Sequence, residues 1–182
     1  MSTRVFDYQA AWLMTPAQAS AAAVMLADDA ARHFGPLSQV IAIARGGTDP
    51  ATVIARRLGV PLLTVQARHN PVSDLYVQAT GHVTCQLDDL RPGDVNGRVL
   101  VVDDICGTGA TLSAVTAALA QVAGPGTSLH TAALCRNAGA ATRPNLIIWD
   151  NLRDWVIFPW EPGPPPGTAT RHLPASTRVM HA

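Results

Sequence analysis

The sequence contains no lysine, and all 13 of its basic residues are arginines. A P-loop for nucleotide triphosphates needs a lysine after its last glycine, so that class of site is excluded. The 13 basic residues are balanced by 13 acidic ones. A net charge of zero gives no electrostatic reason to expect binding to nucleic acid or to an acidic membrane. Long hydrophobic runs are also absent, and none is long enough to cross a bilayer.

Cysteine is scarce: Cys85, Cys106 and Cys135 are far apart in the chain and odd in number. We interpret them as reduced thiols of a cytoplasmic protein. The six histidines have no zinc-ligand spacing. No apolar segment follows a basic start, so no signal peptide is expected. With 182 residues, 48% of them hydrophobic, the chain is long enough to bury a sizeable core in one domain.

Helix-like and strand-like segments alternate along the chain. Thr15-Pro16-Ala17-Gln18 is a capping box with proline in the first helical position, which predicts a helix to about Phe34. Further helices are expected from the cap Thr48-Asp49-Pro50 through Leu58, and over 109–122. The expected strands are 40–44, 61–66, 98–102, 129–134 and 146–149. This alternation predicts an α/β fold with a mostly parallel sheet flanked by helices.

Two segments have no clear periodicity. Residues 67–90 are polar and mixed, and we expect a long excursion with local strand structure. Residues 162–182 are rich in proline, glycine and threonine, which predicts a flexible or loosely packed tail. The expected domain therefore covers residues 1–161, followed by this tail.

The most informative segment runs from Val99 to Leu112, with the sequence VLVVDDICGTGATL. It predicts a buried strand, two carboxylates at Asp103 and Asp104, and a glycine/threonine loop that opens a helix. Carboxylates accept hydrogen bonds from sugar hydroxyls, and loop N–H groups at a helix N-terminus bind phosphate. The pattern therefore predicts a site for a phosphorylated sugar.

This segment resembles the phosphoribosyl-diphosphate (PRPP) signature of the type I phosphoribosyltransferases, closest to the bacterial xanthine–guanine and hypoxanthine branch. The resemblance implies that family's α/β fold, with a small hood built from the N-terminal segment and residues 150–161. It implies Mg²⁺-dependent transfer of 5-phosphoribosyl to a purine-like base in nucleotide biosynthesis, with release of pyrophosphate. It also implies a homo-oligomer with small-molecule substrates and no nucleic-acid or membrane partner.

The resemblance assigns roles to particular residues. Asp103 and Asp104 are expected to be catalytic and, with the loop that follows, to bind PRPP. A second loop, Ala44-Arg45-Gly46-Gly47, resembles the pyrophosphate loop of 6-oxopurine enzymes, in which the peptide before the basic residue is often cis. The expected PRPP-binding residues are Asp103, Asp104, Ile105, Cys106, Gly107, Thr108, Gly109, Ala110 and Thr111, and the expected pyrophosphate-binding residues are Arg45, Gly46 and Arg68.

The segment from Asp154 to Glu161, DWVIFPWE, resembles the hood of the same branch. By that resemblance Trp155 stacks on the base, since a planar indole suits a planar heterocycle. The backbone of Val156 and Ile157 would meet the exocyclic groups of the base. Arg136 lies where the family places a lysine that reads the 6-oxo group. Magnesium would be held by Asp104 and Glu161.

Gly107 departs from the family pattern, because 6-oxopurine enzymes place there an aspartate that faces purine N7. Either the base has no N7, as in a 7-deazapurine, or water or backbone serves that nitrogen. A non-catalytic PRPP-binding regulator is the rival hypothesis. A third reading is an S-adenosylmethionine-dependent methyltransferase, whose glycine loop resembles residues 106–109. That family usually ends its next strand with an acid, which Cys135-Arg136-Asn137 lacks.

Overall fold

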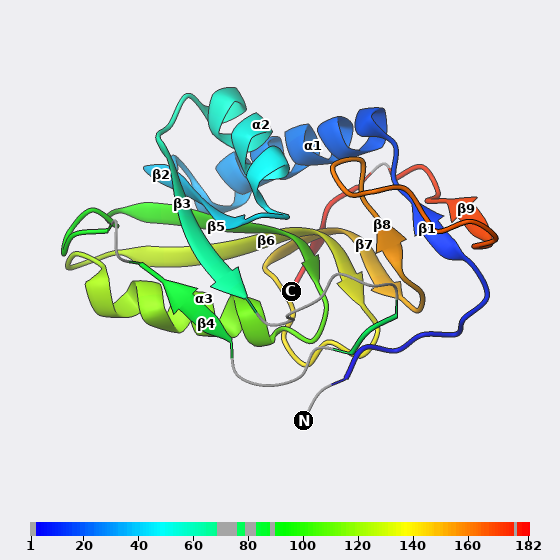
Figure 1. Ribbon diagram of the computed structural model, residues 1–182. Coiled ribbons are helices and arrows are strands. Elements are labelled where there is room, and N and C mark those ends of the chain that lie inside the picture. The colour runs from blue at the N-terminus through cyan, green and yellow to red at the C-terminus, as the bar shows by residue number, and fades with distance from the viewer. Residues whose placement is uncertain (1–2, 69–75, 79–82, 88–89, 177) are drawn as a thin grey trace.

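The computed structural model describes residues 3–68, 76–78, 83–87, 90–176 and 178–182. In this part of the chain a seven-stranded sheet has the order β10-β7-β6-β5-β2-β3-β4 (Figure 1). Its inner strands are parallel, and the edge strands β4 and β10 are antiparallel to their neighbours. The expected mostly parallel sheet is therefore confirmed. The bounds are β2 (Gln39–Ala44), β3 (Leu62–Arg68), β4 (Thr84–Gln86), β5 (Arg98–Cys106), β6 (Ser128–Asn137), β7 (Leu146–Leu152) and β10 (Met180–His181).

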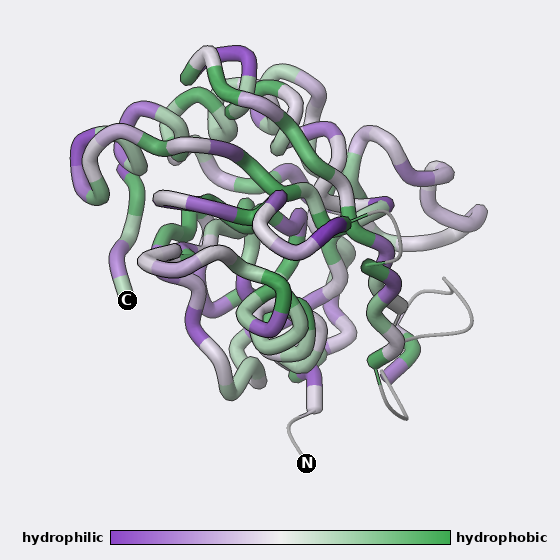
Figure 2. Tube along the Cα trace, turned by 90° about the vertical axis from the view of Figure 1, so that its left-hand side faces the viewer, coloured by the Kyte–Doolittle hydropathy of each residue, from purple (hydrophilic) through white to green (hydrophobic). Residues whose placement is uncertain are grey.

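Helices cover both faces of this sheet. The helices α1 (Pro16–Phe34) and α2 (Thr48–Leu58) lie on one face and α3 (Ala110–Val122) on the other (Figure 1). Within β5, Leu100 and Val102 join the apolar cluster beneath α1 and α2, whereas Val99 and Val101 join the cluster beneath α3. Apolar segments accordingly gather in the interior strands (Figure 2). Within the described ranges no helix is both long and apolar enough to cross a membrane.

The helix boundaries follow local backbone chemistry. The Thr15 hydroxyl accepts a hydrogen bond from the Gln18 N–H, and the Gln18 side chain accepts one from the Thr15 N–H, so the predicted capping box is confirmed. The second helix differs slightly from expectation. Thr48 is already helical, and the N-cap is Gly47, which has no side chain to cap with. Gly59 ends this helix in the left-handed conformation that glycine adopts easily.

The central strands are longer than their apolar runs suggest. The predicted strand 98–102 extends to Cys106, and the predicted strand 129–134 extends to Asn137. These extensions pair with each other, from Asp103 opposite Ala133 to Cys106 opposite Arg136. The two carboxylates therefore belong to the end of β5, so the sheet ladder holds their backbone.

A smaller three-stranded sheet forms the hood. It has the order β8-β1-β9, with β8 (Val156–Ile157) and β9 (Thr170–His172) both parallel to β1 (Ala11–Leu13). The N-terminal segment contributes β1 to it, and residues 150–161 contribute β8. The third strand comes from the C-terminal segment, which the sequence analysis did not include in the hood.

The segment 162–182, for which a flexible or loosely packed tail is expected, is held to the rest of the protein at several points. Besides β9 in the hood, β10 pairs with β7 at the edge of the main sheet. Between them Leu173 is 3% exposed and belongs to the core beneath α1. The indole N–H of Trp149 donates to the Pro174 carbonyl at 2.9 Å. A few backbone pairs and one buried leucine thus anchor a segment whose composition suggested disorder.

We predict that Leu173→Ala lowers the free energy of unfolding by about 2–5 kcal/mol, because it leaves a cavity beneath the hood. His172→Ala is the matched control, since that side chain is exposed and should change stability by less than about 0.5 kcal/mol. Urea denaturation of both variants measures the difference. Equal, small effects of the two changes would mean that the C-terminal segment does not pack as described.

Candidate functional site

The acid pair ends the central strand in a desolvated place. Asp104 is 9% exposed, and its backbone N–H donates to a carboxylate oxygen of Asp103 at 3.0 Å. Burial and the charge of Asp104 raise the pKa of Asp103 well above its usual range. Burial also raises the pKa of Asp104, opposed by hydrogen bonds and by the charge of Arg4. Two carboxylates in such surroundings favour a ligand that donates hydrogen bonds or brings positive charge.

The loop after β5 borders a small hollow. Helix α3 begins directly behind it, so the positive end of the helix dipole points toward this hollow. Gly109 has a φ of 89° and lies against Thr142, a position where a side chain would be both strained and crowded. The arrangement suits a phosphate group. The lining residues are Arg4, Asp103, Ile105, Cys106, Gly107, Thr108, Gly109, Thr111 and Leu112.

Cys106, the last residue of β5, is a structural residue. Its thiol donates to the Thr142 carbonyl at 3.3 Å. Burial raises the pKa of Cys106 to about 12. A thiol with so high a pKa is a poor nucleophile at neutral pH, so its backbone is the part available to a ligand.

The second loop lies against the acid pair. The Ala44–Arg45 peptide bond is cis, as the resemblance led us to expect. A Cβ atom at Gly46 would lie 2.1 Å from an Asp104 carboxylate oxygen, and one at Gly47 would lie 2.3 Å from the Val102 carbonyl. Both glycines therefore permit close approach to β5. Arg45 is exposed.

The two other predicted arginines lie on separate strands of the main sheet, with β5 and β2 between them. Arg68 ends β3, where its backbone pairs opposite Thr84. Arg136 forms an ion pair with Asp150 at 2.7 Å and donates to the Ala140 carbonyl at 3.0 Å. The Arg136 guanidinium is thus held between β6 and the residues around β7. Its role in base binding stays a prediction.

The hood places Trp155 in an aromatic cluster. Its half-buried ring lies 5.9 Å from the ring of Phe6 and 6.3 Å from that of Tyr76, measured between centroids. The N–H groups of Trp12 and Met14 donate to the carbonyls of Trp155 and Ile157.

Strand β8 is the outer strand of this sheet. Because backbone groups alternate in direction along a strand, the N–H and carbonyl of Val156 point away from β1, toward the free edge of β8. Of the two predicted backbone contacts to the base, Val156 is therefore better placed than the Ile157 carbonyl.

The end of the hood segment approaches Asp104. The Trp160 indole N–H donates to the Asp104 carboxylate at 3.4 Å, and its ring stacks on Phe158. The Glu161 carboxylate accepts from the Phe158 N–H at 2.9 Å. Desolvation, together with the charge of Asp104, raises the pKa of Glu161 to about 6. Asp104 and Glu161 are therefore close enough to interact electrostatically.

These carboxylates suit magnesium only in combination with a substrate. Across the described ranges there is no group of three or more His, Cys, Asp or Glu side chains that would hold a metal ion. Mg²⁺ usually binds one or two carboxylates together with phosphate oxygens and water. Asp104 and Glu161 provide such a donor set, so the predicted metal ligands fit this ion.

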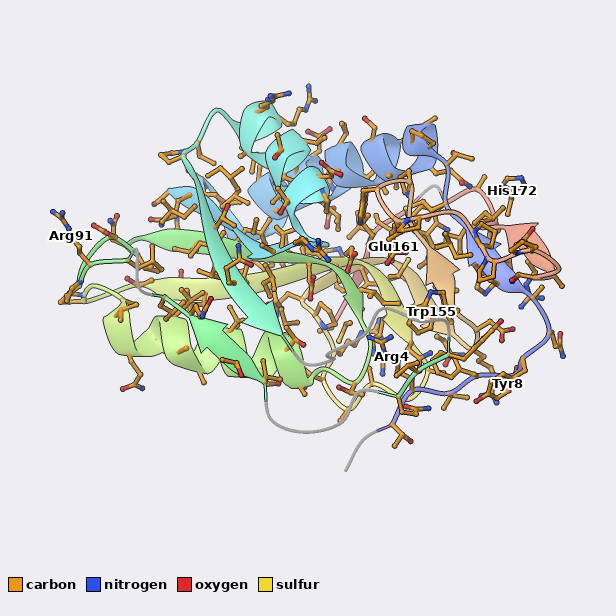
Figure 3. All side chains as sticks on the ribbon, in the orientation of Figure 1. Arg4, Tyr8, Arg91, Trp155, Glu161 and His172 are labelled. Atoms are coloured by element: carbon orange, nitrogen blue, oxygen red, sulfur yellow. The ribbon has the colours of Figure 1, made fainter. Side chains whose placement is uncertain are left out.

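Sequence reasoning missed Arg4. Its side chain reaches from the N-terminal segment into the site, with its Cζ atom 5.2 Å from the Trp155 ring centroid. Figure 3 shows Arg4, Trp155 and Glu161 at the same side of the molecule. Burial lowers the pKa of Arg4, opposed by the charges of Asp104, Asp103 and Glu161. The only signal in the sequence was Gly107, because a Cβ atom there would lie 2.4 Å from the Arg4 Nε.

Comparison with known proteins agrees with this geometry. The family described as "Phosphoribosyl transferase domain" matches residues 22–166. The chain belongs to this family. Phosphoribosyltransferases are transferases. The two predictions from the sequence, that the chain belongs to this family and that it is an enzyme, are confirmed. The matched range contains the acid pair, both loops and Trp155, whereas Arg4 and the strands β1 and β9 lie outside it.

Individual relatives of this phosphoribosyltransferase are distant. It is 28% identical over 131 residues to a xanthine-guanine phosphoribosyltransferase of Roseobacter denitrificans, covering 70% of each chain. It is 33% identical over 100 residues to a hypoxanthine/guanine phosphoribosyltransferase of Methanothermobacter thermautotrophicus, covering 53% of this chain and 51% of the other. The structure of a purine phosphoribosyltransferase from Pyrococcus horikoshii superposes with a TM-score of 0.67 at 25% identity, covering 84% of this chain and 95% of the other.

We predict that Gly46→Ala destabilises the protein by about 1–3 kcal/mol, because the new methyl group would displace the buried Asp104 carboxylate. Gly163→Ala is the matched control, since a Cβ atom there meets nothing within 4 Å. Thermal unfolding of the two variants measures the effect. If Gly46→Ala were as stable as the control, Gly46 would not lie against Asp104.

Proposed function

We propose that this phosphoribosyltransferase transfers the 5-phosphoribosyl group of PRPP to a ring nitrogen of a purine-like base and releases pyrophosphate with Mg²⁺ as cofactor. The base is a 6-oxopurine or a 7-deazapurine. The observation that carries the proposal is the buried acid pair Asp103–Asp104, which lies between a phosphate-type loop and the Arg45–Gly47 loop. The names of the relatives, which include xanthine, hypoxanthine and guanine, support a purine-like base.

The 5-phosphate anchors the substrate. Backbone N–H groups of residues 107–111 and the N-terminus of α3 bind an anion without requiring a cationic side chain. Binding of this remote, unreactive group orients the ribose over the acid pair. The signature residues Ile105, Thr108 and Thr111 border the same hollow, which supports their predicted contact with PRPP.

The acid pair acts on the ribose. Asp103 and Asp104 accept hydrogen bonds from its two hydroxyl groups. As the bond from C1′ to pyrophosphate breaks, the electron pair leaves with the pyrophosphate and positive charge develops on the ribosyl group. The negative field of the two carboxylates stabilises that charge. The base nitrogen then forms the new bond to C1′, and the base releases a proton to water.

The leaving group is stabilised by positive charge and by hydrogen-bond donors. Arg45 lies exposed beside Gly46, where its guanidinium can bind pyrophosphate oxygens. Arg68, at the end of the neighbouring strand, is the second proposed contact. Asp104 and Glu161 would hold Mg²⁺, which would neutralise part of the charge of the pyrophosphate.

The base lies against the hood. Trp155 offers a ring face for stacking, and the free edge of β8 at Val156 offers backbone groups to exocyclic substituents. Arg136 already uses Nη1 on Asp150 and Nη2 on the Ala140 carbonyl, and its buried Nε is the donor that has no partner among the described residues. This makes Trp155 the leading base contact among the predicted ones.

A non-catalytic PRPP-binding regulator is the second candidate. The observation that favours it is the Arg4 side chain, which lies among the acids of the site. Such a protein would bind PRPP without releasing pyrophosphate from it. Release of pyrophosphate that depends on an added base therefore separates the two functions.

We predict that Asp104→Asn lowers kcat/KM for PRPP by about 10–100-fold, because the ribose loses a charge-assisted hydrogen bond worth about 1.5–3 kcal/mol. A coupled pyrophosphate assay with guanine, xanthine and hypoxanthine measures the change. Asp28→Asn is the control, since that carboxylate pairs with Arg57 on the surface. Full activity of Asp104→Asn, or a wild type that releases no pyrophosphate with any base, would contradict the proposal.

We predict that Trp155→Ala raises KM for the base by about 5–100-fold and leaves KM for PRPP nearly unchanged. Stacking of one base on an aromatic ring is worth about 1–3 kcal/mol and does not act on the sugar phosphate. Tyr8→Ala is the matched control, because Tyr8 belongs to the same aromatic cluster but is 66% exposed. Steady-state kinetics with each substrate varied in turn measures the two KM values. An equal loss for both substrates would make Trp155 a packing residue.

A further inference from the structure

Arg4 is held in the site by its backbone. Its N–H donates to the Gln78 side-chain oxygen at 2.9 Å, and its carbonyl accepts from the Gln78 amide at 2.8 Å. The next residue, Val5, makes the same pair of bonds with the side chain of Asn137, which is 1% exposed. These two amide pairs fix the chain direction at Arg4, so the entry of its side chain into the site is built into the fold.

The space that Arg4 occupies exists because residue 107 is glycine. A Cβ atom at Gly107 would lie 2.4 Å from the Arg4 Nε and 2.7 Å from Nη2. The guanidinium therefore lies directly against the glycine backbone. Gly139 makes similar room for the segment, since a Cβ atom there would lie 2.0 Å from the Thr3 carbonyl. Residue 107 is glycine and not the aspartate that the resemblance places there, and this is why the Arg4 guanidinium has room in the site.

The guanidinium lies between the sugar and base parts of the site. It borders the hollow that Asp103 and the loop after β5 also line. Its Cζ atom is 5.2 Å from the Trp155 ring centroid. Its Nε is buried and finds no hydrogen-bond partner within the described ranges. A buried donor without a partner is unfavourable, which favours a ligand that accepts a hydrogen bond there.

We propose that Arg4 determines base specificity by donating hydrogen bonds to the edge of the base nearest Gly107. The inference rests on the proposed function and narrows its substrate class. An arginine only donates, whereas the aspartate that the resemblance places at this position accepts. The preferred base therefore presents an acceptor at that edge, either a ring nitrogen or a carboxylate substituent. A 7-deazapurine with only C–H at that edge is a poor substrate.

Three bases test this proposal. Guanine has a ring nitrogen at position 7, 7-deazaguanine has C–H, and 7-carboxy-7-deazaguanine carries a carboxylate there. We expect Arg4→Met to lower kcat/KM for guanine and for the carboxylate-bearing base by about 10–100-fold. The value for 7-deazaguanine should change by less than about threefold, so the discrimination between bases collapses. Arg91→Met is the matched control, since Arg91 is exposed at the opposite end of the sheet (Figure 3).

Other outcomes overturn the inference. If Arg4→Met lowered kcat/KM equally for all three bases, Arg4 would only balance the charge of the acid pair. If the change raised kcat/KM equally for all three, Arg4 would block access to the site. Unchanged discrimination in a folded variant would also contradict it. If Arg4→Met does not fold, Arg4→Lys is measured instead. It keeps the charge and a compact ammonium donor but loses the planar fork, and a smaller loss of discrimination in the same direction is expected.

Failure of this inference is distinguishable from failure of the proposed function. If the wild type releases no pyrophosphate from PRPP with any of the bases, transfer itself is disproved. If pyrophosphate is released but Arg4→Met leaves the discrimination between bases intact, only the role of Arg4 is disproved.

Discussion

Two carboxylates side by side in a desolvated position repel each other, and the rest of the site is arranged around this repulsion. The backbone N–H of Asp104 donates to Asp103, and the Trp160 indole donates to Asp104. Arg4 adds a positive charge from the N-terminal segment. Even with these contacts the pKa values of both carboxyl groups are raised. The site is therefore prepared for ligands that supply hydroxyl donors and positive charge, which a ribose and a magnesium ion would provide.

The same constraint explains the glycines around the pair. Gly46 leaves room for the Asp104 carboxylate, and Gly107 leaves room for the Arg4 guanidinium. The hood contributes through segments far apart in the sequence, since β1, β8 and β9 come from near residues 12, 156 and 171. The family match ends before β9 and starts after β1. Arg4, β1 and β9 thus lie outside the matched range.

Local signals explain why much of the fold could be predicted. The Thr15–Gln18 capping box and the glycine at position 59 act within a few residues, so the helix start and the helix end that they set can be recognised in the sequence. Strand ends were less predictable because β5 and β6 extend through polar residues that only the sheet ladder stabilises. The packing of Leu173 and the entry of Arg4 depend on partners more than 70 residues away, so no local pattern could reveal them.

The most direct test of this account is a crystal structure of the protein with PRPP, Mg²⁺ and an unreactive base analogue that carries an acceptor at position 7. The account predicts the 5-phosphate on the backbone of residues 107–111, the ribose hydroxyls on Asp103 and Asp104, and the base between Trp155 and the Arg4 guanidinium. A base bound away from Arg4 would contradict the proposed role of that residue. A ribose away from the acid pair would contradict the account as a whole.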